Sequence, residues 1–165
     1  MFDRERTLYA FLLDYARKLA DGIADAHLAD QPAPGLNHPA WILGHLSIGT
    51  DIARQLLGKP TACPESWPEL FGPGSTPRPD RSVYPSKEEL LGALARGHEA
   101  VARASAEVSP ESLAGRHTVD LAFLKESIPT VGDLLAHLMT THEATHLGQL
   151  SAWRRMMGLP GVLQL

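Results

Sequence analysis

The sequence predicts an all-α fold, a four-helix bundle, from three observations. Four segments of about 20 residues carry apolar side chains at spacings of three and four, which is the period of an amphipathic helix. Residues that favour helix starts and stops lie at the ends of these segments. None of the chain shows convincing strand alternation. Helices with one apolar face bury that face against one another, so a bundle is the natural architecture.

Composition narrows the class of protein. The 165 residues suffice for one core, and we expect a single domain over residues 1–165. Apolar residues make up 44% and charged residues 21%, the balance of a soluble globular protein. A net charge of −4 without a basic run argues against nucleic acid as a partner, and the apolar stretches are too short for a membrane. With no signal peptide and a single cysteine, Cys63, we expect a cytoplasmic protein.

The first helix is expected from Asp3 to Ala26. The face that we expect to be buried consists of the apolar side chains at helical spacing, namely Leu8, Phe11, Leu12, Tyr15, Leu19 and Ile23. His27, at the end of this helix, is expected to be solvated or to act as a cap. A turn follows at residues 30–35, where two prolines and a glycine lie close together.

The second helix is expected to begin at Asn37-His38-Pro39 and to run to about Leu57. Asparagine suits the cap, proline suits the first turn, and Gly58 with Pro60 favours a stop. His45 lies in the middle of the apolar stripe of this helix. A histidine in that position is either a core residue satisfied by a hydrogen bond or a metal ligand held by a second partner.

A long Pro/Gly-rich loop connects the second and third helices over residues 59–85, which contain seven prolines. Loops of this length in a compact domain are usually functional or disordered. Trp67, Leu70 and Phe71 indicate that part of the loop packs down, which suggests a lid over a site. Cys63 has no activating neighbour in the sequence, and we expect no chemical role for it.

The third helix opens at the capping box Ser86-Lys87-Glu88-Glu89 and is expected to run to about Glu107. His98 flanks its buried stripe, so we expect a boundary residue, with a role beside the site as the alternative. A connection or short helical turn is expected at Ser109-Pro110-Glu111. Residues 116–128 are poorly defined, with some strand character at 117–123, and His117 is expected to be exposed.

The fourth helix is expected to start at a cap formed by Thr130 and Asp133 and to continue to Met157. His137 falls on the far side of its helical wheel and is excluded as a ligand. A separate row of small residues permits a close helix contact, either inside the bundle or between two subunits. That row consists of Thr140, Ala144, Gly148 and Ser151.

His142 and His146 of this fourth helix form the strongest chemical signal in the chain. Residues four apart lie about 6 Å apart along one helix face, so both imidazoles can reach one metal ion. Both lie on the apolar stripe, as His45 does, which makes His45 the candidate third ligand. Three imidazoles leave coordination positions for water or substrate. We expect zinc or nickel, with iron or manganese as alternatives.

Glu143 and Gln149 are the catalytic candidates beside these histidines. Glu143 lies about 100° from His142 around the helix, where it would orient a ligand or act as a base, with a structural or exposed role as the alternative. Gln149 lies one turn beyond the pair and is expected beside the ligands or in packing. The stretch from His142 to His146 also matches H-E-x-x-H of zinc proteases, but their further ligands are absent downstream, so a protease is disfavoured.

Several motifs together resemble the DinB-like superfamily over nearly the whole chain. They are Asn37-x-x-x-Trp41-x-x-Gly44-His45-Leu46, His142-Glu143-Ala144-x-His146-x-Gly148-Gln149-Leu150, Arg154 and Gly158-x-Pro160. The resemblance implies a four-helix bundle in up-up-down-down order, a homodimer, and a divalent metal at the positions of His45, His142 and His146. Relatives include thiol-dependent S-transferases and a maleylpyruvate isomerase. The iron-binding variant of ergothioneine biosynthesis has glutamate where Gly148 stands, which argues against that activity.

We therefore expect a divalent-metal-binding protein that acts on a small-molecule substrate. The expected reaction is that of a metal-dependent hydrolase or of a thiol-dependent S-transferase or isomerase, with a low-molecular-weight thiol such as bacillithiol or mycothiol as cofactor. The metal would lower the pKa of a bound thiol or water. The alternative is a non-catalytic, metal-binding, stress-associated dimer. An open pocket would favour the enzyme, and a fourth protein ligand would favour a closed structural site.

Overall fold

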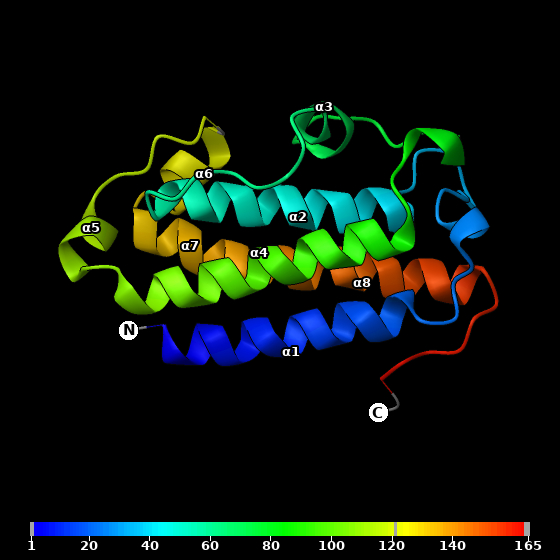
Figure 1. The fold of residues 1–165 in the computed structure, drawn as a ribbon, viewed down its shortest axis with the longest axis horizontal. Helices are drawn as coiled ribbons and strands as arrows, with labels where there is room; N and C mark the ends of the chain where they lie inside the picture. Colours follow the sequence, from blue (N-terminus) through cyan, green and yellow to red (C-terminus); the bar gives the residue numbers. More distant parts are fainter. Residues whose placement is uncertain (1, 121, 164–165) are drawn as a thin grey trace.

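The computed structural model describes residues 2–120 and 122–163, without the side chains of residues 122–124. In this part of the chain every regular element is a helix, which confirms the all-α prediction. The long helical segments lie side by side (Figure 1); they are α1 (Asp3–Ala20), α2 (Pro39–Leu56), α4 (Lys87–Glu107), α7 (Val131–Met139) and α8 (Thr141–Met156). Shorter elements are η1 (Asp25–His27), α3 (Trp67–Phe71), η2 (Arg81–Val83), α5 (Pro110–Ala114) and α6 (Ala122–Ser127).

The helix directions differ from the expected up-up-down-down order. The amide of Lys87, at the start of α4, donates to the Asp25 carboxylate just beyond the end of α1. Arg154, near the end of α8, donates to the Leu19 carbonyl at the same end. Figure 1 shows α2 and α4 running together, opposite to α1 and α7–α8. The order is therefore up-down-down-up, because the long connection after α2 crosses back before α4 begins.

Helix α1 ends at Ala20 rather than at the predicted Ala26. Gly22 has a φ of 73°, the left-handed conformation that commonly follows a helix C-terminus and that glycine adopts without steric cost. The chain then turns into η1. His27 is exposed at its end, and its Nδ1 lies 2.7 Å from the Asp30 carboxylate, so the predicted solvated histidine is confirmed.

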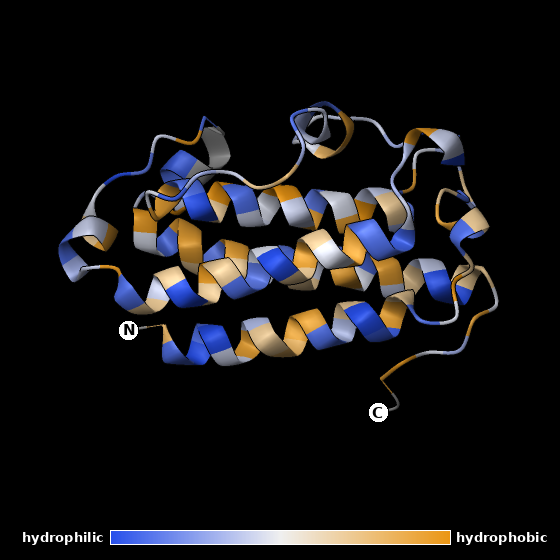
Figure 2. Cartoon of the chain, in the orientation of Figure 1, coloured by the Kyte–Doolittle hydropathy of each residue, from blue (hydrophilic) through white to orange (hydrophobic). Residues whose placement is uncertain are grey.

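The buried face of α1 is also displaced from the predicted stripe. Leu8 and Phe11, which were expected to be buried, are 51% and 53% exposed. Leu12, Leu19 and Ile23 of the predicted stripe are buried, and Tyr9 and Ala16 are buried beside them, because the apolar stripe is wider than the contact and the core face is displaced towards these two residues. Figure 2 shows hydrophobic and hydrophilic positions alternating along each long helix. The exposed pair leaves an apolar strip on the outer flank of α1.

The predicted fourth helix is broken at Thr140. This residue has φ −134° and ψ −82°, outside the helical region, and its hydroxyl donates to the Ala136 carbonyl at 2.6 Å. Threonine side chains that bond to their own backbone compete with helix continuation. Prediction of one continuous helix from Thr130 to Met157 was therefore wrong. The break rotates α8 relative to α7 and changes which side chains share a face.

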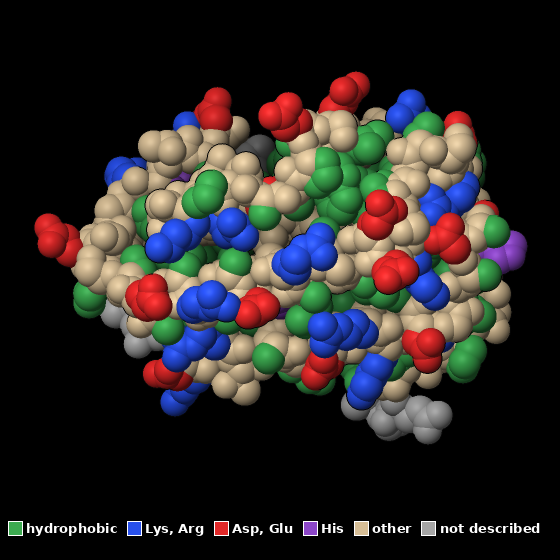
Figure 3. Space-filling model, in the orientation of Figure 1, with side chains coloured by type: hydrophobic (Ala, Val, Ile, Leu, Met, Phe, Trp, Pro, Cys, Tyr) green, Lys and Arg blue, Asp and Glu red, His purple; other side chains and the backbone are tan. Residues whose placement is uncertain are grey.

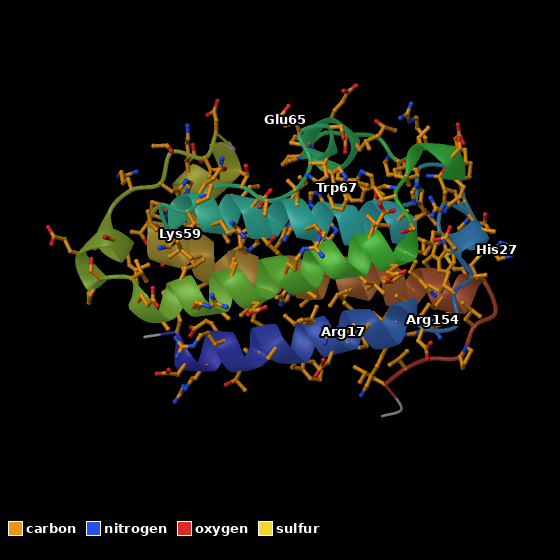
Figure 4. The ribbon with its side chains drawn as sticks, in the orientation of Figure 1. Arg17, His27, Lys59, Glu65, Trp67 and Arg154 are labelled. Atoms are coloured by element: carbon orange, nitrogen blue, oxygen red, sulfur yellow. The ribbon has the colours of Figure 1, made fainter. Side chains whose placement is uncertain are left out.

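The connection after α2 is long but partly ordered by packing. It contains α3 and η2, and the Asp51 carboxylate on α2 accepts hydrogen bonds from the amides of Ala62 and Cys63 at 2.8 and 2.9 Å. Trp67 is buried between α3 and α2 (Figure 4). Burial raises the pKa of the Cys63 thiol to about 12, so it stays protonated at neutral pH. This supports the expectation that Cys63 has no chemical role.

Residues 115–131 bring a further segment against the end of α2. An isolated antiparallel bridge joins Arg116 and Thr130, and α6 lies between them in sequence. The strand character expected at 117–123 is thus reduced to this bridge among the described residues, and Leu121 itself lies outside them. His117 is 7% exposed, so its predicted exposure was wrong. Its Nε2 donates to the Ile128 carbonyl at 3.0 Å, which explains its burial.

Arg154 joins α1 and α8 at the end of the bundle where both of these helices terminate. This side chain is 5% exposed and donates to the backbone carbonyls of Leu19 and Asp21 at 2.7 and 2.6 Å (Figure 4). It thereby connects α8 to the end of α1. Figure 3 shows lysine and arginine side chains interspersed with aspartate and glutamate on the face formed by α4 and α1. Within the described residues, no helix is long and apolar enough to cross a lipid bilayer.

Candidate metal centre

The structure brings His45 of α2 together with His142 and His146 of α8. The Nε2 atoms of His45 and His142 lie 3.1 Å apart. One nitrogen from each of the three side chains lies within 4.8 Å of the other two. The ring centroids are separated by 4.5 Å for His45–His146 and by 4.8 Å for His142–His146. The three residues singled out from the sequence thus form one cluster between two helices.

His45 is oriented by its second ring nitrogen. Nδ1–H donates to the Phe71 carbonyl at 2.7 Å, and the ring stacks on Trp41 with centroids 4.5 Å apart. A carbonyl can only accept, so Nδ1 must carry the proton and Nε2 of the neutral ring keeps its lone pair. The lone pair is directed at His142. Phe71 belongs to α3, so the connection after α2 orients this histidine.

His146 is held in the same way by a side chain of its own helix. Its Nδ1 lies 3.1 Å from Oε1 of Gln149, which also accepts a hydrogen bond from the Asn37 amide at 2.9 Å. An amide oxygen accepts, so Nδ1 carries the proton and Nε2 is free to bind a ligand. Gln149 lies in the position expected of a residue beside the ligands. Asn37 extends this chain of contacts to the segment before α2.

His142 differs from its neighbours, because its Nδ1 is buried without a hydrogen-bond partner among the described residues. The Nε2 atom of His142 is the ring nitrogen with a polar neighbour, Nε2 of His45 at 3.1 Å. The ring fits against α2 because position 49 is glycine: a Cβ there would lie 3.3 Å from Cε1 of His142. A larger residue at Gly49 would push the ring away from His45. The close approach of α2 and α8 at this level therefore depends on that glycine.

All three imidazoles are expected to be neutral at pH 7. Burial, together with the smaller effect of the neighbouring histidines, lowers the pKa of His142 to about 3. Burial and the nearby His45 lower the pKa of His146 to about 4. Burial lowers the pKa of His45 against the opposing effect of its bond to Phe71. Neutral imidazole is the form that binds a metal ion, so little proton release opposes binding.

The donor set fits a divalent ion. In a tetrahedral zinc site with Zn–N distances near 2.0–2.1 Å, two nitrogens lie about 3.3 Å apart. The separation of 3.1 Å between His45 and His142 is close to that value. A metal ion between these two nitrogens accepts a lone pair from each when the His142 proton is on Nδ1. The partners of His45 and His146 supply the outer contacts that hold ligating imidazoles in place.

A cavity of about 210 Å³ opens beside the three histidines, and we call it the metal cavity. Its other walls are mainly apolar and come from α2, α7, the connection after α2 and the segment after α5, with Ile48, Ile52, Pro73, Val119, Leu134 and Leu138 among them. Pro73 places the long connection at the edge of the cavity, as a lid would require. No aspartate or glutamate lines the metal cavity within the described residues.

His137 also lines the metal cavity, although it was expected to face away. The break at Thr140 explains the difference, since the wheel of α8 does not continue into α7. The ring of His137 lies 5.7 Å from that of His142, and its Nδ1 lies 2.7 Å from the Thr141 hydroxyl. His137 does not belong to the three-histidine cluster, which agrees with the prediction that it is not a metal ligand.

Glu143 does not line the metal cavity. It is 2% exposed, and its Oε1 lies 2.7 Å from Nε2 of His98 on α4, although the contact is not aligned as a conventional hydrogen bond. His98 stacks on Tyr9 of α1 with ring centroids 3.6 Å apart. The predicted boundary position of His98 was wrong, since it is 3% exposed. Glu143 therefore joins three helices, and the structure gives it no place beside the three histidines.

Sequence reasoning missed this Tyr9–His98–Glu143 cluster. Each residue lies at the edge of an apolar stripe, and nothing local links them along the chain. Burial raises the pKa of Glu143 well above its ordinary value and lowers that of His98 to about 3. Both shifts favour a single proton shared by the pair rather than two separate charges. Because Glu143 contacts His98 and does not line the metal cavity, it is not placed to act as the general base of a zinc protease.

The sequence was compared with protein-family models and with curated proteins. No curated protein matches the chain. A family model described as the DinB superfamily matches residues 9–150, which include most of α1, all of α2, α4 and α7, the first part of α8 and all three histidines. On this match over most of its length, the chain belongs to the DinB superfamily.

Proposed function

We propose that His45, His142 and His146 hold one divalent metal ion, zinc or nickel, and that the protein is a metal-dependent enzyme acting on a small molecule. The observation that carries the proposal is the convergence of three neutral imidazoles on an open, mostly apolar cavity. Three protein ligands with a cavity beside them are typical of catalytic sites, whereas structural sites are closed by a fourth ligand. Iron or manganese is the alternative metal.

When bound, the ion would supply Lewis acidity and lower the pKa of a thiol or water in the cavity. The chain supplies orientation and exclusion of water. Phe71 and Gln149 fix two of the rings through their carbonyl oxygens. The apolar walls reduce the local dielectric constant and thereby strengthen the attraction between the ion and an anionic nucleophile. Pro73, from the long connection, closes one side.

The lining supports a thiol nucleophile over water. Hydrolytic metal sites commonly use a carboxylate to remove the proton from water, and the described residues place none in the metal cavity. A thiol has an ordinary pKa near 8.5, so a nearby cation alone brings much of it to the thiolate form at pH 7. The proposed reaction is therefore thiol-dependent S-transfer or isomerisation, with a low-molecular-weight thiol as cofactor. Metal-dependent hydrolysis is the second candidate.

The proposal is tested by turnover of nickel- or zinc-loaded protein. A small thiol is mixed with an alkyl halide, and thioether formation and halide release are followed; an ester is offered in a parallel assay. We expect thioether formation that is lost on chelation and in His45→Ala, and retained in His27→Ala, a matched exposed histidine. Ester cleavage alone would favour the hydrolase. Bound metal without either reaction would favour the non-catalytic, metal-binding alternative.

We further propose that the chain forms a homodimer through α1 and α8. Leu8 and Phe11 are exposed on α1, and Ala144 and Gly148 are exposed on the neighbouring α8. Small residues on one helix permit close approach by large apolar side chains of another. Light scattering should give twice the monomer mass for wild type and a monomer for Phe11→Glu. A monomeric wild type at micromolar concentration would contradict the dimer.

A further inference from the structure

A second cavity adjoins the metal cavity along α2. It has a volume of about 480 Å³, and we call it the outer cavity. Ile52 of α2 and Val119, from the segment after α5, line both cavities. These two apolar side chains therefore lie where the two cavities meet, and we call this junction the neck. Figure 1 shows the segment that carries Val119 passing beside the C-terminal end of α2.

The outer cavity differs chemically from the metal cavity. Its lining residues include Arg116, Gln55 and Thr118, whose side chains carry a guanidinium, an amide and a hydroxyl group. No acidic side chain lines it within the described residues, and Arg116 has no ion-pair partner among them. A guanidinium presents paired N–H donors that match the two oxygens of a carboxylate. The outer cavity is thus suited to the anionic end of a small molecule.

The backbone that carries Arg116 is fixed before any ligand binds. The carbonyl of Gly115 accepts from the Val131 amide at 2.8 Å, and the His117 amide donates to the Pro129 carbonyl at 3.3 Å. The buried His117 ring adds its bond to Ile128. A cation on a fixed segment loses less conformational freedom on binding than one on a free loop. These bonds explain why the sequence carries a buried histidine next to Arg116.

The two ends of this path are far enough apart to select ligands by length. His45 and Gln55 are ten residues apart on α2, which corresponds to about 15 Å along the helix axis. A short molecule bound at the histidines does not reach the outer cavity. A longer one passes Ile52 and Val119 with an apolar chain and ends near Arg116.

Resting on the proposed function, we propose that the substrate or thiol cofactor is an elongated molecule with three unlike parts. One end carries a donor for the metal, such as a thiol. The middle is apolar and occupies the neck between Ile52 and Val119. The other end carries a carboxylate or a similar anion, which binds Arg116. Arg116 is then a residue that determines specificity, and it lies outside the metal ligands.

The test uses two series of thiols that differ only at the far end. Nickel-loaded protein is titrated with ω-mercaptocarboxylates of propanoate, hexanoate and undecanoate length and with the matching ω-mercaptoalcohols, and affinity is read from the thiolate-to-nickel absorption. For at least one of the longer lengths we expect the carboxylate to bind about tenfold more tightly than the alcohol, because only the carboxylate forms charge-assisted hydrogen bonds with Arg116. For propanoate we expect no difference.

Two variants distinguish a direct contact between Arg116 and the carboxylate from a general effect of the protein's charge. Arg116→Gln should abolish the preference for the carboxylate and leave the affinity for the alcohols unchanged. Arg96→Gln, a matched loss of an exposed arginine on α4 that lines neither cavity, should keep the preference. Equal binding of acid and alcohol at every length, or a preference that survives Arg116→Gln, would overturn this inference and leave the metal site intact. Wild-type protein that binds neither nickel nor zinc would overturn the proposed function and the inference together.

Discussion

Replacing Glu143 by glutamine should change how stability depends on pH. The carboxyl group is buried against His98, and burial raises its pKa well above the ordinary value of 4.5. The folded protein therefore keeps a proton that the unfolded chain has lost at neutral pH. The contribution of this carboxyl group to the free energy of unfolding is fully present below about pH 4.5 and declines as the pH rises towards the folded-state pKa. Glutamine has the same shape and does not titrate.

The size of the effect follows from proton linkage. A difference of one bound proton changes the free energy of unfolding by about 1.4 kcal/mol per pH unit. From about pH 5.5 to about pH 7.5, the stability of wild type relative to Glu143→Gln should fall by up to about 2.7 kcal/mol. Taking the difference between the two proteins cancels the titration of the metal-site histidines, which both share.

Urea unfolding of metal-free protein, followed by circular dichroism at several pH values, measures this difference. Glu99→Gln is the control, because Glu99 is an exposed glutamate on α4 in an ion pair with Arg103. Its stability relative to wild type should stay within about 0.5 kcal/mol over the same range. A Glu143→Gln difference that does not vary with pH would mean that Glu143 is ionised in the fold without a compensating proton on His98, and would refute the reasoning.

Three further variants test how the site and the bundle are held. Gly44→Ala should destabilise the fold by about 1–3 kcal/mol in urea unfolding and weaken metal binding, because a Cβ there would lie 2.4 Å from the Phe71 ring, whose residue also orients His45. Gln149→Leu should lower zinc affinity about tenfold in competition titrations by releasing His146, with stability unchanged. Arg154→Met should cost about 2–4 kcal/mol of stability, since it leaves backbone carbonyls buried without donors, and should leave zinc affinity unchanged. Unchanged stability in the first and third variants, or unchanged affinity in the second, would contradict these roles.

The three histidines could be identified from the sequence because each has a defined position on a helix. His45 stands on the apolar stripe of α2, and a spacing of four residues puts His142 and His146 on one face of α8 whatever the rest of the chain does. Their convergence needed only that α2 and α8 pack together. The partners of these rings, Phe71 and Gln149, were harder to foresee, because one comes from a connection without a periodic pattern.

Other features depend on information that periodicity does not contain. The break at Thr140 arises from a side-chain bond to the local backbone, and a wheel drawn through it placed His137 on the wrong side. Contact between His98 and Glu143 depends on the register of α4 against α8. On α1, Phe11 continues the apolar stripe but lies beyond the width of the contact. Each case requires the position of one helix relative to another.

The central claim is that three histidines hold one divalent metal ion, and elemental analysis tests it most directly. Protein purified without an affinity tag is measured as wild type, as His45→Ala and as the double variant His142→Ala/His146→Ala, with His27→Ala as the control. We predict about one zinc or nickel per chain in wild type and His27→Ala, and loss of the metal in the other two. Wild type without metal, or metal retained in both cluster variants, would contradict the account.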